Sequence, residues 1–64
     1  MMNELLKRVN NIKDEKKKKV IASILKNKNW YKELSMDTSL SILIDLGYKI
    51  DEAKKIYISL NTNN

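Results

Sequence analysis

The sequence predicts an all-α fold, a small bundle of four or five short helices with a C-terminal helical hairpin, from three observations. The 64 residues include no Pro and a single Gly, so the chain lacks the turn residues that a small barrel needs. Its apolar residues recur at steps of three and four, the period of a helix with one buried side. A chain of this length forms one domain, with a core of about a dozen side chains.

The N-terminal half predicts two helices. Residues 2–12 carry one apolar face, made by Met2, Leu5, Leu6, Val9 and Ile12. A second helix is expected over 14–28, with Asp14 as N-cap and Glu15 in the first turn, because a side-chain acceptor and negative charge stabilise a helix N-terminus. The alternative is one continuous helix through 3–28, since no helix-breaking residue separates the two.

A break at Asn27–Asn29 and a short aromatic turn are expected next. Trp30, Tyr31 and Leu34 form that turn, which packs two aromatic rings. Asp37 or Thr38 is expected to cap the following helix, whose apolar residues are Leu40, Leu43, Ile44 and Leu46.

Gly47 is expected to end that helix, because glycine readily adopts the left-handed conformation of a helix stop. Tyr48 and Ile50 would supply the accompanying hydrophobic contacts. Asp51 is then expected to cap the last helix, which runs through Ala53, Ile56, Tyr57 and Leu60. Residues 61–64 are polar and predict a frayed tail.

The single domain, 1–64, divides sharply by charge. Residues 1–32 hold ten Lys or Arg and three acids, a net charge of +7, whereas residues 33–64 hold three Lys and five acids, a net charge of −2. The basic N-terminal half, and the run Lys16–Lys19 above all, predicts contact with an acidic protein surface or with phosphates. A solvated helix start that keeps the protein soluble is the alternative interpretation of the run.

Composition argues against catalysis and against cofactors. The chain has no Cys and no His, so it offers no thiolate, no imidazole base and no ordinary transition-metal site. One Gly cannot build a phosphate-cradling loop. We therefore expect no enzymatic activity, no catalytic residue, no metal and no cofactor.

Targeting signals are not expected either. No apolar run approaches the roughly 18 residues that span a bilayer. The start of the sequence lacks the order of charged, apolar and small residues of a signal peptide. The expected compartment is the cytoplasm.

The stretch Leu46-Gly47-Tyr48, followed by Glu52-Ala53, resembles ubiquitin-associated-like helical modules. It is most similar to the C-terminal domain of the Holliday-junction-binding subunit of the bacterial branch-migration complex. The resemblance covers residues 38–60 and implies a protein-binding module. Such domains have a third helix that this sequence lacks after Leu60, so the N-terminal helices would replace it.

These observations favour a small interaction or regulatory protein that binds a macromolecular partner, in the first place a protein. The expected hydrophobic contact residues are Trp30, Tyr31, Ile42, Ile44 and Ile58, and burial in the core is the other interpretation of Trp30 and Tyr31. The expected contacts to an acidic surface or nucleic acid are Lys16, Lys17, Lys18, Lys19, Lys54 and Lys55. The surplus of apolar helix surface also favours a homodimer.

Two alternatives remain open from the sequence. Residues 39–58 have the spacing of a helix-turn-helix, so the protein could be a small DNA-binding regulator that uses Lys54 and Lys55. Two residues argue against DNA binding. Asp51 lies at the start of the recognition helix, where its negative charge would repel phosphates. Leu43 lies at the helix crossing, where such motifs normally have a small residue. The less favoured alternative is a set of basic amphipathic helices lying on anionic lipid. Because the chain has one Arg against many Lys, nucleic-acid binding would be mostly non-specific and salt-sensitive.

Overall fold

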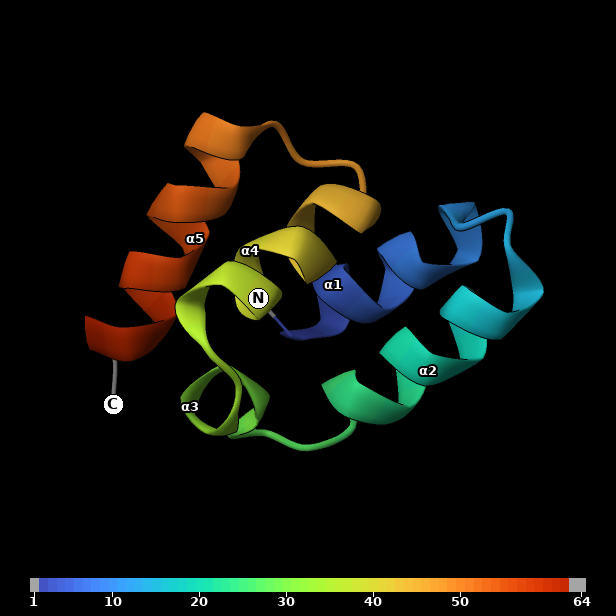
Figure 1. Cartoon of the computed structure of the whole chain (residues 1–64), viewed down its shortest axis with the longest axis horizontal. Coiled ribbons are helices and arrows are strands. Elements are labelled where there is room, and N and C mark those ends of the chain that lie inside the picture. The colour runs from blue at the N-terminus through green and yellow to red at the C-terminus, as the bar shows by residue number, and fades with distance from the viewer. Residues whose placement is uncertain (1, 63–64) are drawn as a thin grey trace.

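The computed structural model describes the backbone of residues 2–62 and the side chains of residues 4–62, so the predicted place of Met2 in an apolar face lies outside the described side chains. The elements, shown in Figure 1, are α1 (Met2–Arg8), the 3-10 turn η1 (Val9–Asn11), α2 (Glu15–Leu25), α3 (Trp30–Glu33), α4 (Met36–Asp45) and α5 (Ile50–Thr62). No strand occurs among these residues. The predicted all-α fold with a C-terminal helical hairpin is confirmed.

The helices pack into a body that measures 31 × 23 × 20 Å. In Figure 1, α2 and α5 lie at opposite ends of the longest axis, α1 and α4 lie between them, and α3 lies below. None of the described helices is both long and apolar enough to cross a membrane.

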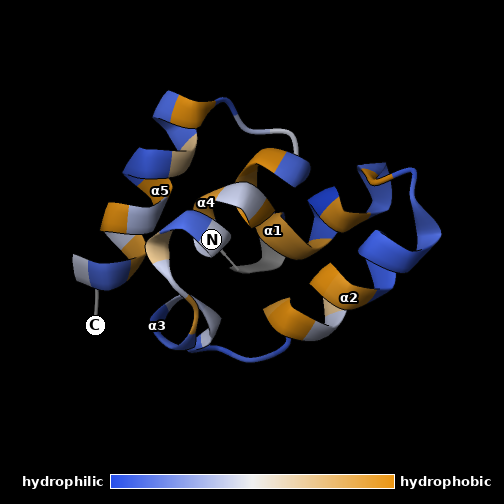
Figure 2. Ribbon diagram, in the orientation of Figure 1, coloured by the Kyte–Doolittle hydropathy of each residue, from blue (hydrophilic) through white to orange (hydrophobic). Residues whose placement is uncertain are grey.

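The core draws on every α-helix. Four leucines are almost completely inaccessible to solvent: Leu5 in α1, Leu25 in α2, Leu43 in α4 and Leu46 just after it. Figure 2 shows that hydrophobic and hydrophilic segments alternate along the longer helices. The other buried apolar residues are Val9, Ile12, Ile21, Trp30, Tyr31, Leu40, Ile42, Ala53 and Leu60.

The first two helices are separate, so the continuous-helix alternative is wrong. α1 passes into η1, and Ile12 has an extended backbone (φ −78°, ψ 122°) that still buries its side chain. Asp14 caps α2 as predicted, since its carboxylate accepts hydrogen bonds from the backbone N–H groups of Lys16 and Lys17 at 2.9 and 3.1 Å.

α2 ends at Leu25, three residues earlier than predicted. The side-chain oxygen of Asn27 accepts a hydrogen bond from the backbone N–H of Asn29 at 2.9 Å, and the carbonyl of Asn27 accepts one from the N–H of Trp30 at 3.1 Å. An Asn that bonds to the local backbone in this way competes with helix continuation. The predicted break at Asn27–Asn29 is confirmed.

The helix caps of α4 and α5 differ from the prediction. Ser35, rather than Asp37 or Thr38, caps α4, because its hydroxyl accepts a hydrogen bond from the N–H of Thr38 at 3.1 Å. α5 begins at Ile50, so Asp51 lies inside the first turn. The carboxylate of Glu52 instead accepts a hydrogen bond from the N–H of Lys49 at 2.9 Å, as in one half of a capping box.

Gly47 ends α4 as predicted. Its φ of +102° lies in the region that L side chains rarely adopt. The N–H of Tyr48 bonds to the carbonyl of Leu43 at 3.2 Å, and the N–H of Gly47 bonds to that of Ile44 at 2.9 Å, which is the Schellman pattern. Tyr48 packs against the core, whereas Ile50 is exposed and does not.

The predicted frayed tail is wrong for its first two residues, which belong to α5. The side-chain amide of Asn61 donates a hydrogen bond to the carbonyl of Tyr57 at 2.9 Å, and the hydroxyl of Thr62 donates one to the carbonyl of Ser59 at 3.2 Å. These bonds satisfy carbonyls in the last turns. Residues 63–64 lie outside the described part of the chain.

The single Arg joins the two halves of the molecule. The guanidinium of Arg8 lies 3.9 Å from the centre of the Tyr48 ring and donates a hydrogen bond to the carbonyl of Leu46 at 3.4 Å. Beside it, Lys17 of α2 forms an ion pair with Asp45 at 3.5 Å. Two cations from the N-terminal half therefore meet the C-terminal end of α4, where the helix dipole favours positive charge.

Candidate interaction surfaces

Exposed apolar side chains concentrate on the hairpin of α4 and α5. The described large apolar residues with exposed side chains are Leu6, Val20, Met36, Ile44, Ile50 and Ile58. Four of these six belong to α4 or α5, and we call Met36, Ile44, Ile50 and Ile58 the hairpin surface. The prediction that this part of the chain carries more apolar surface than its helices bury is therefore confirmed.

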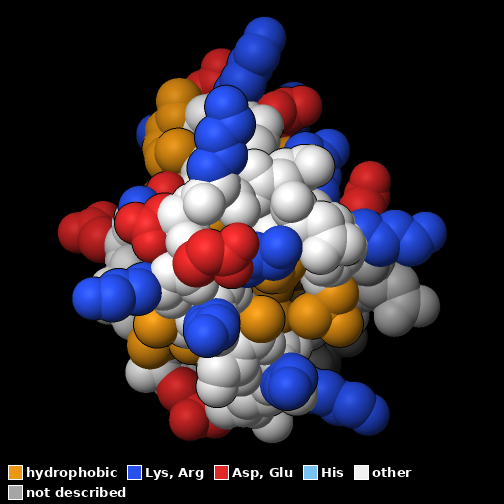
Figure 3. All heavy atoms as spheres, turned by 90° about the vertical axis from the view of Figure 1, so that its right-hand side faces the viewer, with side chains coloured by type: hydrophobic (Ala, Val, Ile, Leu, Met, Phe, Trp, Pro, Cys, Tyr) orange, Lys and Arg blue, Asp and Glu red, His pale blue; other side chains and the backbone are white. Residues whose placement is uncertain are grey.

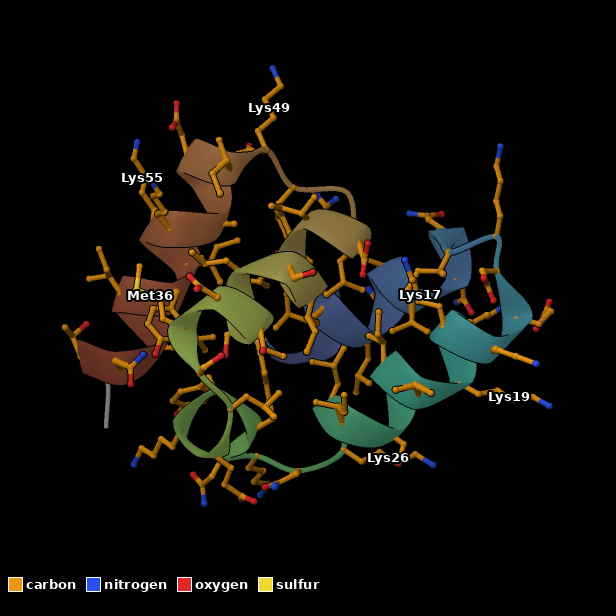
Figure 4. The ribbon with its side chains drawn as sticks, in the orientation of Figure 1. Lys17, Lys19, Lys26, Met36, Lys49 and Lys55 are labelled. Atoms are coloured by element: carbon orange, nitrogen blue, oxygen red, sulfur yellow. The ribbon has the colours of Figure 1, made fainter. Side chains whose placement is uncertain are left out.

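The four residues of the hairpin surface are spread along both helices of the hairpin. Ile44 and Ile50 lie on either side of the turn, at 44% and 46% exposure. Met36 begins α4, and Figure 4 shows its side chain reaching over α5. Ile58 lies two turns along α5 and is the most exposed of the four, at 59%.

Three predicted contact residues are instead part of the core. Trp30 and Tyr31 begin the four-residue α3, which turns both rings inward with their centres 5.7 Å apart and their planes at 90°. Ile42 is buried because it lies on the inward side of α4 with Ser39, Leu40 and Leu43, which are buried as well. The prediction that Trp30, Tyr31 and Ile42 contact a partner is corrected. Ile44 and Ile58 remain available.

The lysine run does not form one row of charge. Successive residues of a helix point about 100° apart, and Figure 4 shows Lys17 and Lys19 pointing in different directions. Lys17 is engaged with Asp45, and Lys18 is half-buried. Lys16 and Lys19, three residues apart, lie on the outer side of α2 with no carboxylate within 4.0 Å among the described residues.

Lys54 and Lys55 lie far from that run. Both are exposed on α5. Figure 4 shows Lys55 at the end of the molecule opposite Lys17 and Lys19. The structure therefore separates the predicted basic contacts into two groups and does not build one basic surface from them.

A pocket between α2 and α3 was not predicted. It has a volume of about 240 Å³ and is lined by Ser23, Ile24, Asn27, Trp30, Glu33 and Leu34. The side-chain amide of Asn27 donates a hydrogen bond to the carboxylate of Glu33 at 2.6 Å and so links the two walls. No periodicity indicates such a pocket, because it depends on how the turn after α2 sets α3 against it. The buried indole Nε1 of Trp30 has no hydrogen-bond partner in the described part of the chain.

Carboxylates do not gather in this structure. Within the described residues, no three Asp or Glu side chains lie together in a way that could hold a metal ion. Asp14, Glu33, Asp45 and Glu52 each bond to a backbone or side-chain group nearby. These four carboxylates therefore serve the fold.

The chain matches no protein-family model, no curated protein and no solved structure. The likeness of residues 38–60 to ubiquitin-associated-like modules stays a prediction. The features that bear on function are the hairpin surface, the exposed lysines and the α2–α3 pocket.

Proposed function

We propose that this protein is a non-enzymatic interaction module that binds a protein partner through the hairpin surface. The positively charged N-terminal half would draw it toward an acidic region of that partner. Binding, and not chemistry, is proposed because four of the eight carboxylates serve the fold and the composition offers neither thiol nor imidazole.

The observation that carries the proposal is the exposure of Ile58. The opposite side of α5 already supplies the core with Ala53 and Leu60, so Ile58 contributes little to folding. Burying an isoleucine side chain fully contributes about 1.5–3 kcal/mol. Ile44 is also exposed and lies at the turn end of the neighbouring helix, so a partner that spans the hairpin would bury two β-branched side chains without reorganising the core.

The net charge of the molecule supports encounter with an acidic partner, although residues 33–64, which carry the hairpin surface, have a net charge of −2. Lys54 lies one turn before Ile58, and both are exposed. Residues 1–32 add a net charge of +7 to the molecule. A field of this sign accelerates encounter with an acidic partner, while buried apolar contacts hold the complex.

Site-directed photocrosslinking in the native cells tests the proposal. A photoreactive phenylalanine analogue at position 58 should give an adduct of discrete mass. An additional Ile44→Asp change should remove it, because a charge would be buried in the interface. The matched control places the analogue at exposed Asn10 in η1, which should give no such adduct. An adduct of twice the mass of the chain would identify the partner as a second copy. Equal labelling at both positions would defeat the proposal.

DNA binding is the second candidate, supported by the geometry of the hairpin. Four residues connect α4 to α5, Gly47 lies in the turn, and Ala53 is buried where the helices approach. Lys54 and Lys55 are exposed on the second helix, as groove contacts need to be.

One pair of variants separates the two candidates. Lys54→Glu with Lys55→Glu should abolish binding to a labelled DNA duplex if α5 enters a groove, and should slow association with a protein partner only modestly. Ile58→Asp should have the opposite pattern. Fluorescence anisotropy at 50 and 200 mM salt measures binding to the DNA duplex, and crosslinking yield measures binding to the protein partner. Lys16→Glu with Lys19→Glu is the control for charge alone, because it makes the same change in net charge on α2.

A further inference from the structure

The α2–α3 pocket has an apolar base and a polar rim. Ile24 of α2, Trp30 of α3 and Leu34 just after α3 supply apolar surface. Ser23 and the bonded pair of Asn27 and Glu33 supply the polar atoms. Its volume of about 240 Å³ is below the roughly 300–1,000 Å³ of pockets that hold drug-sized ligands or cofactors. This size suits one bulky apolar side chain.

The walls of the pocket are fixed before any ligand arrives. Asn27 uses its amide nitrogen to bond to Glu33 at 2.6 Å and its amide oxygen to accept from Asn29 at 2.9 Å. Its carbonyl accepts from the N–H of Trp30 at 3.1 Å. Because one residue ties the end of α2 to the start and end of α3, little ordering is required on binding.

Apolar surface continues from the pocket along α2. Val20 precedes Ile24 by four residues, so the two side chains are neighbours on one side of the helix. Val20 is 57% exposed, and nothing in its own helix requires an apolar residue there. Figure 3, which faces the end of the molecule where α2 begins, shows hydrophobic surface lying between Lys and Arg side chains.

The surroundings of the pocket are strongly basic. Residues 23–34, which include all of the residues lining the pocket, contain three Lys and one Glu, Glu33, which is bonded to Asn27, and four more Lys lie nearer the start of α2 at positions 16–19. Lys26 and Lys28 flank Asn27 in the chain, Lys32 precedes Glu33, and all three are exposed. Among the described residues, Lys17 alone of the seven has a carboxylate within 4.0 Å. The lysines therefore leave a positive field that an acidic ligand would neutralise.

From these observations we infer that the α2–α3 pocket binds an acidic protein segment, which inserts one bulky apolar side chain and places carboxylates against the surrounding lysines. This site shares no residue with the hairpin surface. The inference therefore goes beyond the function proposed above and can fail without affecting it.

A pair of synthetic peptides tests the inference on the intact protein. One is a capped heptapeptide with Leu at the centre and three acidic residues on each side, and its partner has Ala at the centre. Trp30 is the single Trp of the chain and lines the pocket, so its emission reports binding directly. We expect the Leu peptide to bind about tenfold more tightly than the Ala peptide, because burial of the larger side chain adds to affinity. We also expect both affinities to fall as salt rises.

Matched serine variants locate the binding site. Ser23→Leu fills the pocket from its exposed rim and should weaken the Leu peptide about tenfold. Ser41→Leu makes the same change on the outside of α4 and should leave binding unchanged. Equal binding of the two peptides would show that lysines alone attract them, and this would overturn the inference. Absence of binding at millimolar peptide, or equal effects of the two variants, would overturn it as well.

Discussion

The two halves of the molecule contribute almost equally to the core but differ in surface. Residues 1–32 supply seven of the thirteen buried apolar residues, and residues 33–64 supply six. The N-terminal half nevertheless carries ten of the thirteen Lys and Arg residues and four of the six residues that line the α2–α3 pocket, whereas the C-terminal half carries four of the six exposed large apolar side chains. Neither half has a complete core of its own, so one folding unit presents two unlike surfaces.

The difference in surface implies a difference in binding. Attraction to the basic end should weaken with salt, because its lysines are exposed and largely unpaired. Contact with the hairpin surface should depend on salt much less, since apolar burial supplies its free energy. Single variants can show whether the two halves fold as one unit and which contacts between the halves stabilise the fold.

The largest effect is expected from Leu5→Ala. Leu5 of α1 is completely buried, so the change should remove about 2–5 kcal/mol. This approaches the whole stability of a domain of this size, at about 0.05–0.15 kcal/mol per residue. Because the core is shared, Trp30 fluorescence and the methyl NMR signals of Leu60 should report one coincident urea transition. Leu6→Ala is the control. Because Leu6 is 39% exposed, this variant should lose far less free energy of unfolding. Folded Leu60 signals after loss of the Trp30 signal would show that the halves fold independently.

Gly47→Ala should produce the next largest effect. At φ +102° an alanine is strained, and its Cβ would lie 3.3 Å from the guanidinium of Arg8. We expect a loss of about 1–2 kcal/mol in the free energy of unfolding. Gly47→Asn should lose less, because Asn tolerates positive φ better. Thermal unfolding followed by circular dichroism measures both variants, and equal losses would show that backbone strain is not the cause.

Removing the contact of Arg8 with Tyr48 should have a smaller effect on stability. A cation over an aromatic ring contributes about 0.5–2 kcal/mol. A double-mutant cycle of Arg8→Ala and Tyr48→Leu should therefore give a coupling energy of about 0.5–1 kcal/mol. Arg8→Lys should recover only part of the stability that Arg8→Ala loses. The lysine keeps the positive charge, but its ammonium lacks the planar group that stacks on the ring. Additive effects would mean that Arg8 stabilises the fold through the carbonyl of Leu46 alone.

Prediction from sequence succeeded where a local signal decides the structure. Asp14 caps α2, Asn27–Asn29 ends a helix, and Gly47 stops α4, because each acts through its own side chain or backbone within a few residues. The helix starts at α4 and α5 were less accurate. Several neighbouring polar residues could serve as caps there, and the choice of Ser35 and Lys49 depends on the geometry of the turn before them.

The surface could be predicted only in part, because burial depends on distant partners. Ile42 and Ile44 are both apolar and nearby in one helix, yet one is buried and the other exposed. The sequence cannot show that α4 packs on several elements and leaves one side open. For the same reason the α2–α3 pocket was missed, and the sequence left both core packing and partner contact open for Trp30 and Tyr31, which are buried.

The smallest effect is expected at the ion pair of Lys17 and Asp45, and its size differs between the partners. The two side chains are 51% and 29% exposed, so the pair contributes about 0.2–1 kcal/mol. Lys17→Gln leaves an unpaired carboxylate at the C-terminal end of α4, where the helix dipole disfavours negative charge. It should lower stability by about 0.5 kcal/mol. Asp45→Asn removes the attraction and the dipole penalty together and should change stability little. Urea unfolding at 20 mM and 500 mM NaCl measures both. The cost of Lys17→Gln should shrink at high salt, and an unchanged cost would point to packing of the lysine stem.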